Sequence, residues 1–140
     1  MKTQIVYDDP STIEGFETVD VKYGTSGLEQ IVNNSSEEIY ITNCLDKVDF
    51  QEANKILMIA LTKLRLNGKI VVNGTNLRTL CLNVIANEVD AENFSKVISN
   101  CSSLRDSSDI EEILIQHNLT IETNVIRGNT YEITAIRTNS

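Results

Sequence analysis

Short runs of β-branched and aromatic residues alternate with polar turns along the first part of the chain. Residues Thr3 to Tyr7 form one such run, and Asp8-Asp9-Pro10 ends it because proline removes a backbone donor and fixes φ. Apolar and polar side chains then alternate from Phe16 to Tyr23, before two glycines break the pattern. We expect a strand in each run. Residues Leu28 to Val32 are also apolar, and they fit either a helical turn or an edge strand.

The middle of the chain has the pattern of a strand, a helix and another strand. Glu38 to Asn43 and Ile70 to Val72 are β-branched runs of the kind found in buried strands. Between them Asp49 and Glu52 fit a capping box, and Gly68 fits the end of a helix. The apolar stripe of this helix consists of Phe50, Ala53, Leu57, Leu61 and Leu64. Such a crossover is almost always right-handed and joins parallel strands.

Two short helices are predicted after Thr75. Leu77 to Ile85 carries an apolar helical stripe, and Asp90 fits the cap of a second helix with Val89 and Phe94 as a hydrophobic staple. We expect both helices to lie on one face of the sheet.

A last helix and a hairpin complete the pattern. Ser108 and Glu111 fit the capping box of the helix, and Asn118 fits its stop. Leu119 to Ile126 and Thr130 to Arg137 are rich in strand-forming residues, and three residues separate them. A connection this short predicts an antiparallel hairpin.

The composition indicates the number of domains and the fold class. The chain has 140 residues, of which 41% are hydrophobic and 5% aromatic, as expected of one domain with an aliphatic core. No internal repeat or linker indicates a second domain, so residues 1–140 are predicted to form one domain. The fold class is therefore α/β, with a mostly parallel sheet, helices on its faces and a C-terminal antiparallel hairpin.

The charge limits the partners that the protein is expected to bind. A formal net charge of -8 has the wrong sign for a broad face that neutralises phosphates. The one cluster of basic residues is interpreted as solvated charge around a turn, and it consists of Lys63, Arg65, Lys69 and Arg78. No segment approaches the ~20 apolar residues of a membrane span, and the first residues do not resemble a signal peptide. We therefore expect a cytoplasmic protein without a membrane partner.

Cysteine and histidine offer little chemistry in this sequence. Cys44, Cys81 and Cys101 lack CxxC spacing and sit beside apolar residues, which is typical of buried thiols rather than of a metal site or a disulfide. His117 is the only histidine, and a helix C-terminus, where we expect it, favours a structural role. No metal site is predicted.

Polar residues follow several predicted strands. Asp8 and Asp9 follow the first, Asp20 lies near the end of the second, and Asn43 and Asn73 end the next two. Because ligands bind outside the carboxyl ends of parallel strands, these side chains predict a polar pocket. The alternative is that Asp and Asn stand there because they make good turns. This reading is favoured for the Asp8-Asp9 pair, whose side chains face opposite ways on an extended chain.

Three stretches of sequence, in this order, resemble one enzyme family. Residues Gly15 to Val21 are similar to the second strand of class I methyltransferases, including small ones encoded in bacteriophage genomes. Residues Glu37 to Asp46 resemble the family's fourth strand with the stretch that follows it, and Leu64 to Val72 resemble the entry to its fifth strand. The resemblance implies a Rossmann-like domain.

The end of the first strand departs from the family. There the family has Gly-x-Gly, which lets the backbone approach the cofactor closely, whereas the residues from Ile5 to Ser11 include no glycine. Only Asp9 to Gly15 separate the first two strands, fewer than a normal parallel crossover needs. Either the crossover is abbreviated or the first strand lies elsewhere.

The resemblance also implies a cofactor and a place for it. The cofactor would be S-adenosylmethionine, with Asp8 and Asp9 beside its methionine part, Asp20 on the ribose and Asn43 beside the methyl-transfer position. A small molecule or a protein would accept the methyl group, through in-line transfer helped by positioning. Catalytic residues are not identified. Two hypotheses stay open: a minimal S-adenosylmethionine-dependent methyltransferase, and a non-catalytic protein of the same fold that acts in protein interaction, in a virion or in host takeover.

Overall fold

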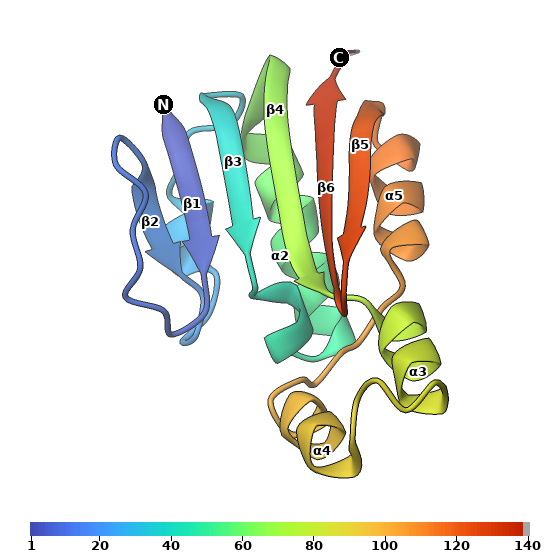
Figure 1. Ribbon diagram of the computed structural model, residues 1–140. Coiled ribbons are helices and arrows are strands. Elements are labelled where there is room, and N and C mark those ends of the chain that lie inside the picture. Colours follow the sequence, from blue (N-terminus) through green and yellow to red (C-terminus); the bar gives the residue numbers. More distant parts are fainter. Residues whose placement is uncertain (139–140) are drawn as a thin grey trace.

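A six-stranded sheet forms the centre of the computed structural model, which describes residues 1–138. Its strands are β1 (Lys2–Val6), β2 (Glu17–Asp20), β3 (Ser36–Thr42), β4 (Leu64–Thr75), β5 (Leu119–Arg127) and β6 (Thr130–Arg137). They lie in the order β2-β1-β3-β4-β6-β5, and within the described residues only β6 runs in the opposite direction to the other strands (Figure 1). The predicted mostly parallel α/β sheet with a C-terminal hairpin is confirmed.

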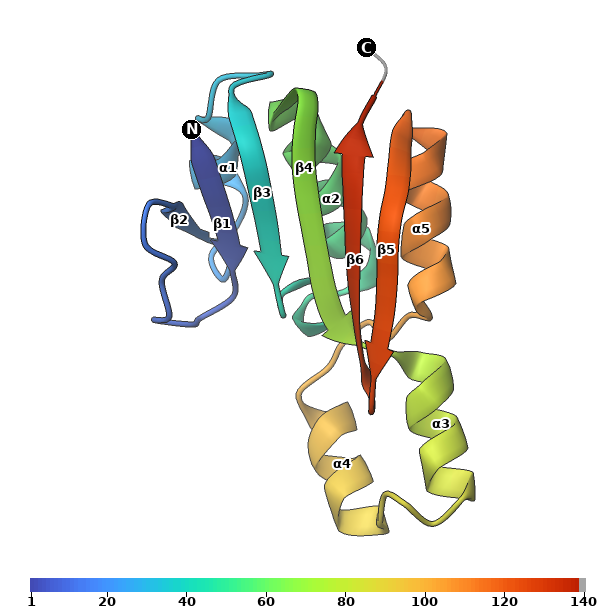
Figure 2. The same ribbon diagram turned by 45° about the horizontal axis from the view of Figure 1, so that its top comes forward.

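Helices connect most of the strands. They are α1 (Ser26–Glu29), α2 (Phe50–Lys63), α3 (Leu77–Ile85), α4 (Ala91–Ser99) and α5 (Ser107–Gln116), with a 3-10 turn η1 (Leu45–Lys47) before α2. Figures 1 and 2 show α1, α2 and α5 against the same face of the sheet. Within the described residues, no helix has both the length and the apolar character that crossing a bilayer requires.

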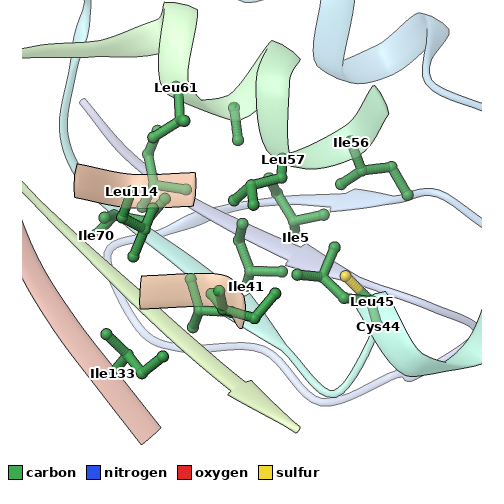
Figure 3. Packing of buried hydrophobic residues seen from close by; sticks show 14 of the residues in the cluster. Ile5, Ile41, Cys44, Leu45, Ile56, Leu57, Leu61, Ile70, Leu114 and Ile133 are labelled. Carbon is green, nitrogen blue, oxygen red and sulfur yellow. The ribbon is translucent and has the colours of Figure 1, made fainter. Parts of the chain in front are cut away.

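The core lies between this face of the sheet and the helices α2 and α5. Ile41, Ile70 and Ile133, on three neighbouring strands, are fully buried and belong to one cluster with Leu57 of α2 and Leu114 of α5 (Figure 3). Burying each of these side chains contributes roughly 1.5–3 kcal/mol relative to an exposed position. This packing fixes the strands, and with them the positions of the loops at their ends.

Helix α2 begins as predicted but ends earlier. The Asp49 carboxylate accepts a hydrogen bond of 2.8 Å from the backbone amide of Glu52 and so caps the helix. The helix stops at Lys63 rather than at Gly68, because Leu64 already has extended backbone angles and pairs with β3. The Arg137 guanidinium, at the end of β6, donates to the carbonyl oxygens of Leu61 and Leu64 at 3.0 and 2.6 Å. It thereby supplies hydrogen-bond donors to carbonyl groups that the end of the helix leaves unpaired.

The first crossover is abbreviated, and the first strand lies where it was predicted. Strand β1 pairs in parallel with both β2 and β3, although no helix lies between β1 and β2. Strand β2 is shorter than the predicted run from Phe16 to Tyr23 because the chain turns after Asp20, whose carboxylate accepts from the amide of Lys22 at 2.9 Å. The ambiguous segment at Leu28 begins as a helical turn, α1.

Helices α3 and α4 do not cover a face of the sheet, contrary to the prediction. They project beyond the edge of the sheet at which β4 ends, as Figure 2 shows. Helix α3 buries only Leu80, and α4 buries none of its residues. Asp90 caps α4 as predicted, since its carboxylate accepts from the amide of Asn93 at 2.8 Å. Helical periodicity identified these helices but not the surface on which they lie.

The cap of α5 and the environment of Lys63 also differ from the predictions. Asp106 rather than Ser108 caps α5, because its carboxylate accepts from the amide of Ser108. Lys63, predicted to be solvated, is only 7% exposed. Its ammonium group donates to the side chain of Asn33 and to the carbonyl oxygen of Glu29. The free-energy cost of burying the ammonium charge is offset by the hydrogen bonds to these two acceptors.

Candidate functional site

The candidate site lies at the edge of the sheet where β1, β2, β3 and β4 end. The chain passes from β1 outward to β2 and then returns across β1 to β3, so the strand order reverses between β1 and β3. Open α/β sheets bind ligands outside the carboxyl ends of the strands at such a switch point. The residues predicted for the site, Asp8, Asp9, Asp20, Asn43 and Asn73, all lie along this edge.

Asp8 and Asp20 are brought into direct contact. The backbone amide of Asp8 donates to Oδ1 of Asp20 at 3.0 Å, and the amide of Lys22 donates to the same oxygen at 2.9 Å. The Lys22 ammonium group pairs with Oδ2 of Asp8 at 2.9 Å. The hydrogen bond and the ion pair with Asp8 raise the pKa of Lys22. Together these contacts link the end of β1 to the end of β2.

Asp8 has a left-handed backbone conformation, with φ at 49°. Aspartate adopts this conformation more readily than most residues that have a Cβ atom, although glycine does so with less strain. The chain therefore adopts a positive φ at the end of β1 although no glycine is present there. The turn retains a backbone suited to glycine, but a carboxylate projects from it.

Asp9 takes no part in this contact and instead accepts a hydrogen bond within the loop that follows β1. Its Oδ1 accepts from the amide of Ser11 at 2.9 Å, and the hydrogen bonds from Ser11 lower the pKa of Asp9. Further along the loop, the amide of Ile13 donates to the side-chain oxygen of Gln4 on β1 at 3.1 Å. Gln4 is 2% exposed, so the loop covers this part of β1.

Asn43 and Asn73 are brought together at the ends of β3 and β4. The amide of Asn43, whose φ is 47°, donates to Oδ1 of Asn73 at 2.9 Å. Both residues line a hollow of about 240 Å³ that also reaches Arg127 and Tyr131 of the hairpin. The two asparagines thus border a polar hollow, and Asn43, with its positive φ, is also a turn residue, whereas Asn73 is paired within β4.

Asp46 belongs to the site and was not predicted as a site residue. It follows Asn43 in the turn after β3 and is 7% exposed. Its Oδ2 accepts from the amide of Thr75, at the end of β4, at 3.0 Å. Its Oδ1 is buried and accepts no hydrogen bond within the described residues. The sequence places an acid after the strand but carries no sign that one of its oxygens would lack a partner.

Two cavities adjoin at Lys47 and Asn100, beside the end of α4 and the segment that follows it. One, of about 250 Å³, is lined by Asn43, Asp46, Lys47, Thr75, Val97, Asn100 and Cys101. The other, of about 350 Å³, is lined by Tyr7, Asp8, Lys47, Ser99, Asn100 and Ser102. Lys47 and Asn100 line both cavities, so the two adjoin.

The cysteines differ in their exposure. Cys81 is exposed and Cys101 is partly buried, contrary to the prediction of buried thiols. Cys44 is fully buried, and desolvation strongly raises the pKa of its thiol. Desolvation also raises the pKa of the Cys101 thiol, with a smaller contribution from the charge of Asp46. His117 lies at the end of α5 before β5 begins, at the opposite edge of the sheet. In residues 1–138, no three Cys, His, Asp or Glu side chains form a group that could hold a metal ion.

Several solved structures with a similar fold are methyltransferases. An O-methyltransferase family protein from Burkholderia thailandensis is 12% identical, with a TM-score of 0.63 over 88% of this chain and 36% of that one. The magnesium protoporphyrin IX methyltransferase of Synechocystis, with bound S-adenosylhomocysteine, is 15% identical, with a TM-score of 0.57 over 87% and 50%. A didemethyltoxoflavin N-methyltransferase from Burkholderia thailandensis, also with bound S-adenosylhomocysteine, is 10% identical, with a TM-score of 0.56 over 89% and 52%.

These similarities show the fold, and at such identities they show nothing further. The chain spans between about a third and a half of the length of these three proteins. No model of a known protein family matches the sequence, and no curated protein is significantly similar to it.

The end of β1 does not fit the glycine-rich cradle expected of a class I methyltransferase. The carboxylate of Asp8 projects there and is paired with Lys22. The loop that follows is held against β1 by Gln4 instead of leading into a helix. A helix N-terminus, which favours anionic groups of a ligand, is therefore missing between β1 and β2.

Proposed function

We propose that this protein is a non-catalytic member of the methyltransferase fold, which binds a partner or a small ligand other than S-adenosylmethionine and does not transfer methyl groups. The observation that carries the proposal is the link between Asp8, Asp20 and Lys22 across the ends of β1 and β2. The resemblance assigned S-adenosylmethionine to this place, with Asp8 and Asp9 beside its methionine part and Asp20 on its ribose. Here their polar groups are engaged with one another and with the backbone.

Two further features support the proposal. The loop between β1 and β2 is short and packs on Gln4, so it leaves no helix to face the cofactor. In residues 1–138 the histidine lies at the opposite edge, and burial raises the pKa of Cys101, the thiol that lines a cavity at this edge. Methyl transfer to a weak nucleophile benefits from a base near its operating pH, and none of these groups supplies one.

A second candidate function, binding of S-adenosylmethionine without the glycine cradle, is favoured by one observation. Asp20 stands at the end of β2 beside β1, and its Oδ2 accepts no hydrogen bond from residues 1–138. That oxygen could accept from a ribose hydroxyl group. Asp8 would then have to release Lys22 to make room for the methionine part.

We further propose that the protein acts in the cytoplasm, as the resemblance to small bacteriophage-encoded members suggests, and that its partner is a protein or a small molecule. This part of the proposal rests on the sequence. The contacts of two lysines support a partner that does not need a broad basic face. Lys2 and Lys69 both pair with Glu38, at 3.5 and 3.3 Å between nitrogen and oxygen.

Calorimetric titration tests the proposal. We expect no heat of binding with S-adenosylmethionine or S-adenosylhomocysteine at millimolar ligand, for the native chain and for Asp20→Ala alike. Saturable binding by the native chain that Asp20→Ala abolishes would refute the proposal and establish the second candidate. The matched control is Asp109→Asn, because Asp109 is an exposed acid of α5 outside the site.

A further inference from the structure

Helix α3 presents an apolar face to solvent. Residues three and four apart are neighbours on a helix surface. The outward face of α3, with its C-cap, consists of six exposed residues: Leu77, Arg78, Cys81, Leu82, Ile85 and Ala86. Arg78 is the one polar residue among them. In residues 1–138, α3 has three large exposed apolar side chains, whereas α2, α4 and α5 have one each. Such a concentration of exposed apolar surface marks a contact surface.

The inward side of α3 is held by hydrogen bonds to other parts of the chain. The side chain of Asn83 donates to Oδ1 of Asn129 at 2.6 Å. Asn76, which precedes the helix, is 1% exposed, and its Oδ1 accepts from the amide of Ser107 at 2.8 Å. Turning the helix to bury its outward face would break these contacts. The helix is thus fixed beyond the edge of the sheet (Figure 2), and another molecule is needed to cover the outward face.

The charges around this face favour a second copy of the chain as the molecule that covers it. Because the chain has a formal net charge of -8, two copies repel each other over most of their surfaces. The outward face of α3 carries no acidic residue, so repulsion is least there. Arg78 lies at the start of the helix with its side chain 74% exposed, and the exposed Glu88 follows the end of the helix. When two α3 helices pack antiparallel, Arg78 of each copy lies near Glu88 of the other.

The outward face of α3 is also complementary to itself. Its residues are arranged symmetrically about a centre between Cys81 and Leu82. In a two-fold contact, residue i of one copy meets residue j of the other, and the reverse holds as well. An antiparallel pair about this centre sets Arg78 of one copy against Ile85 of the other. The methylene groups of the arginine then cover the isoleucine, while the guanidinium group stays in water near Glu88.

We propose that the protein forms a weak two-fold dimer in which α3 packs antiparallel against α3 of a second copy. The inference goes beyond the proposed function and does not rest on it, because the outward face of α3 takes no part in the contacts among Asp8, Asp20 and Lys22. A helix of nine residues presents less surface than the about 800 Å² per partner of a standard stable interface. The dissociation constant should therefore be on the order of 100 μM.

Sedimentation equilibrium from micromolar to millimolar protein measures the association. The native chain should be a monomer at the lowest concentration and a dimer at the highest. Ile85→Lys should weaken the dimer about tenfold or more, because it removes an apolar contact and sets an ammonium group against Arg78 of the other copy. Ile115→Lys is the matched control, because Ile115 is also exposed, at 58%, near the end of α5. This variant should dimerise as the native chain does.

Cys81 reports the geometry of the contact. It is exposed and lies at the centre of the outward face, so the two copies of this residue come close together in the dimer. A short bismaleimide, which adds to one thiol at each end, should link the two copies of the native chain. Cys81→Ser should abolish the linkage. Cys101→Ser, which removes a partly buried thiol, should leave it unchanged.

Measurements on the native chain can overturn the inference even if a variant fails to fold. A native chain that stays monomeric at millimolar concentration would refute it. A dimer that the two lysine substitutions weaken equally, or that the bismaleimide does not link through Cys81, would form through another surface and would refute it as well. The proposed function is tested separately, by titration with S-adenosylhomocysteine, so its failure would leave the dimer in place.

Discussion

The backbone amide of Asp8 donates a hydrogen bond of 3.0 Å to the carboxylate of Asp20, and this bond joins the ends of the first two strands. It places at the end of β1 a residue whose side chain is ion-paired with Lys22. Asp8, Asp20 and Lys22 therefore form a solvent-exposed polar network beside the cavity that Tyr7 and Asp8 line.

Removing the carboxylate of Asp20 should loosen both turns that it supports. Asp20→Ala loses two acceptor contacts, to the amides of Asp8 and Lys22, and should lower the free energy of unfolding by about 1 kcal/mol, since the site is exposed. Asp20→Asn keeps one acceptor oxygen and should lose less. Urea unfolding measures both. Equal losses in the two variants would mean that the amide contacts contribute nothing.

Gly68 is required by its contacts in the bulge at the start of β4. A Cβ atom there would lie 2.7 Å from Cδ1 of Leu64 and 2.8 Å from the carbonyl oxygen of Arg65. Gly68→Ala should therefore destabilise the protein by about 1–3 kcal/mol, as overpacking does. Gly27→Ala is the matched control, because its Cβ atom would meet nothing closer than 3.4 Å. Thermal unfolding of the two variants should separate them, and similar midpoints would contradict the steric argument.

Arg137 should contribute to stability from outside the helix that it caps. Arg137→Ala leaves the carbonyl oxygens of Leu61 and Leu64 without their donor and should cost about 2 kcal/mol. Arg127→Ala, an exposed arginine in the neighbouring strand, should change the stability little. Hydrogen exchange in the last turn of α2 should speed up in the first variant only. No change there would show that the helix end holds without the guanidinium group.

The pH dependence of stability should include a contribution from Asp106. The hydrogen bond from the Ser108 hydroxyl, more than any other contact, lowers the pKa of Asp106 below 3.8. A lowered pKa means that the unfolded chain binds a proton more readily than the folded one. The stability from this group is therefore full above pH 3.8 and is lost as the pH falls through the folded-state pKa.

Asp106→Asn tests this contribution while keeping a side chain that can cap α5. The native protein should be the more stable of the two at pH 7, and the difference should shrink as the pH falls below 3.8. Asp109→Asn serves as the control for the loss of one acid from the same helix turn. A difference between native and Asp106→Asn that stays constant with pH would rule out a lowered pKa.

Most helices and strands were predicted from the sequence because their caps, apolar stripes and turns are formed by residues that lie close together in the chain. Asp49 and Asp90 cap the helices that follow them, as their spacing to the apolar stripes indicated. The hairpin between β5 and β6 followed from a connection of three residues. The end of α2 was placed too late because Arg137, which satisfies it, comes from the far end of the chain.

The candidate site was only partly predictable for the same reason. Aspartate and asparagine at strand ends predicted side chains along one edge of the sheet, since parallel strands end together. Two features depend on contacts between strands that no local sequence pattern indicates. Asp20 binds the backbone of Asp8, and Asp46 keeps one oxygen without a partner in residues 1–138. The positions of α3 and α4 beyond the sheet also depend on such contacts, because their apolar stripes fit more than one surface.

The most direct test of the central claim is a titration with S-adenosylhomocysteine followed by the backbone amide resonances of Asp8, Lys22 and Asn43. These amides lie at the ends of β1, β2 and β3, where the cofactor would have to sit. Because Asp8 is paired with Lys22 at the end of β1 and no helix follows this strand before β2, we predict no saturable shift of the three resonances at millimolar ligand. A saturable shift of all three in the native chain, absent from Asp20→Ala, would contradict the account.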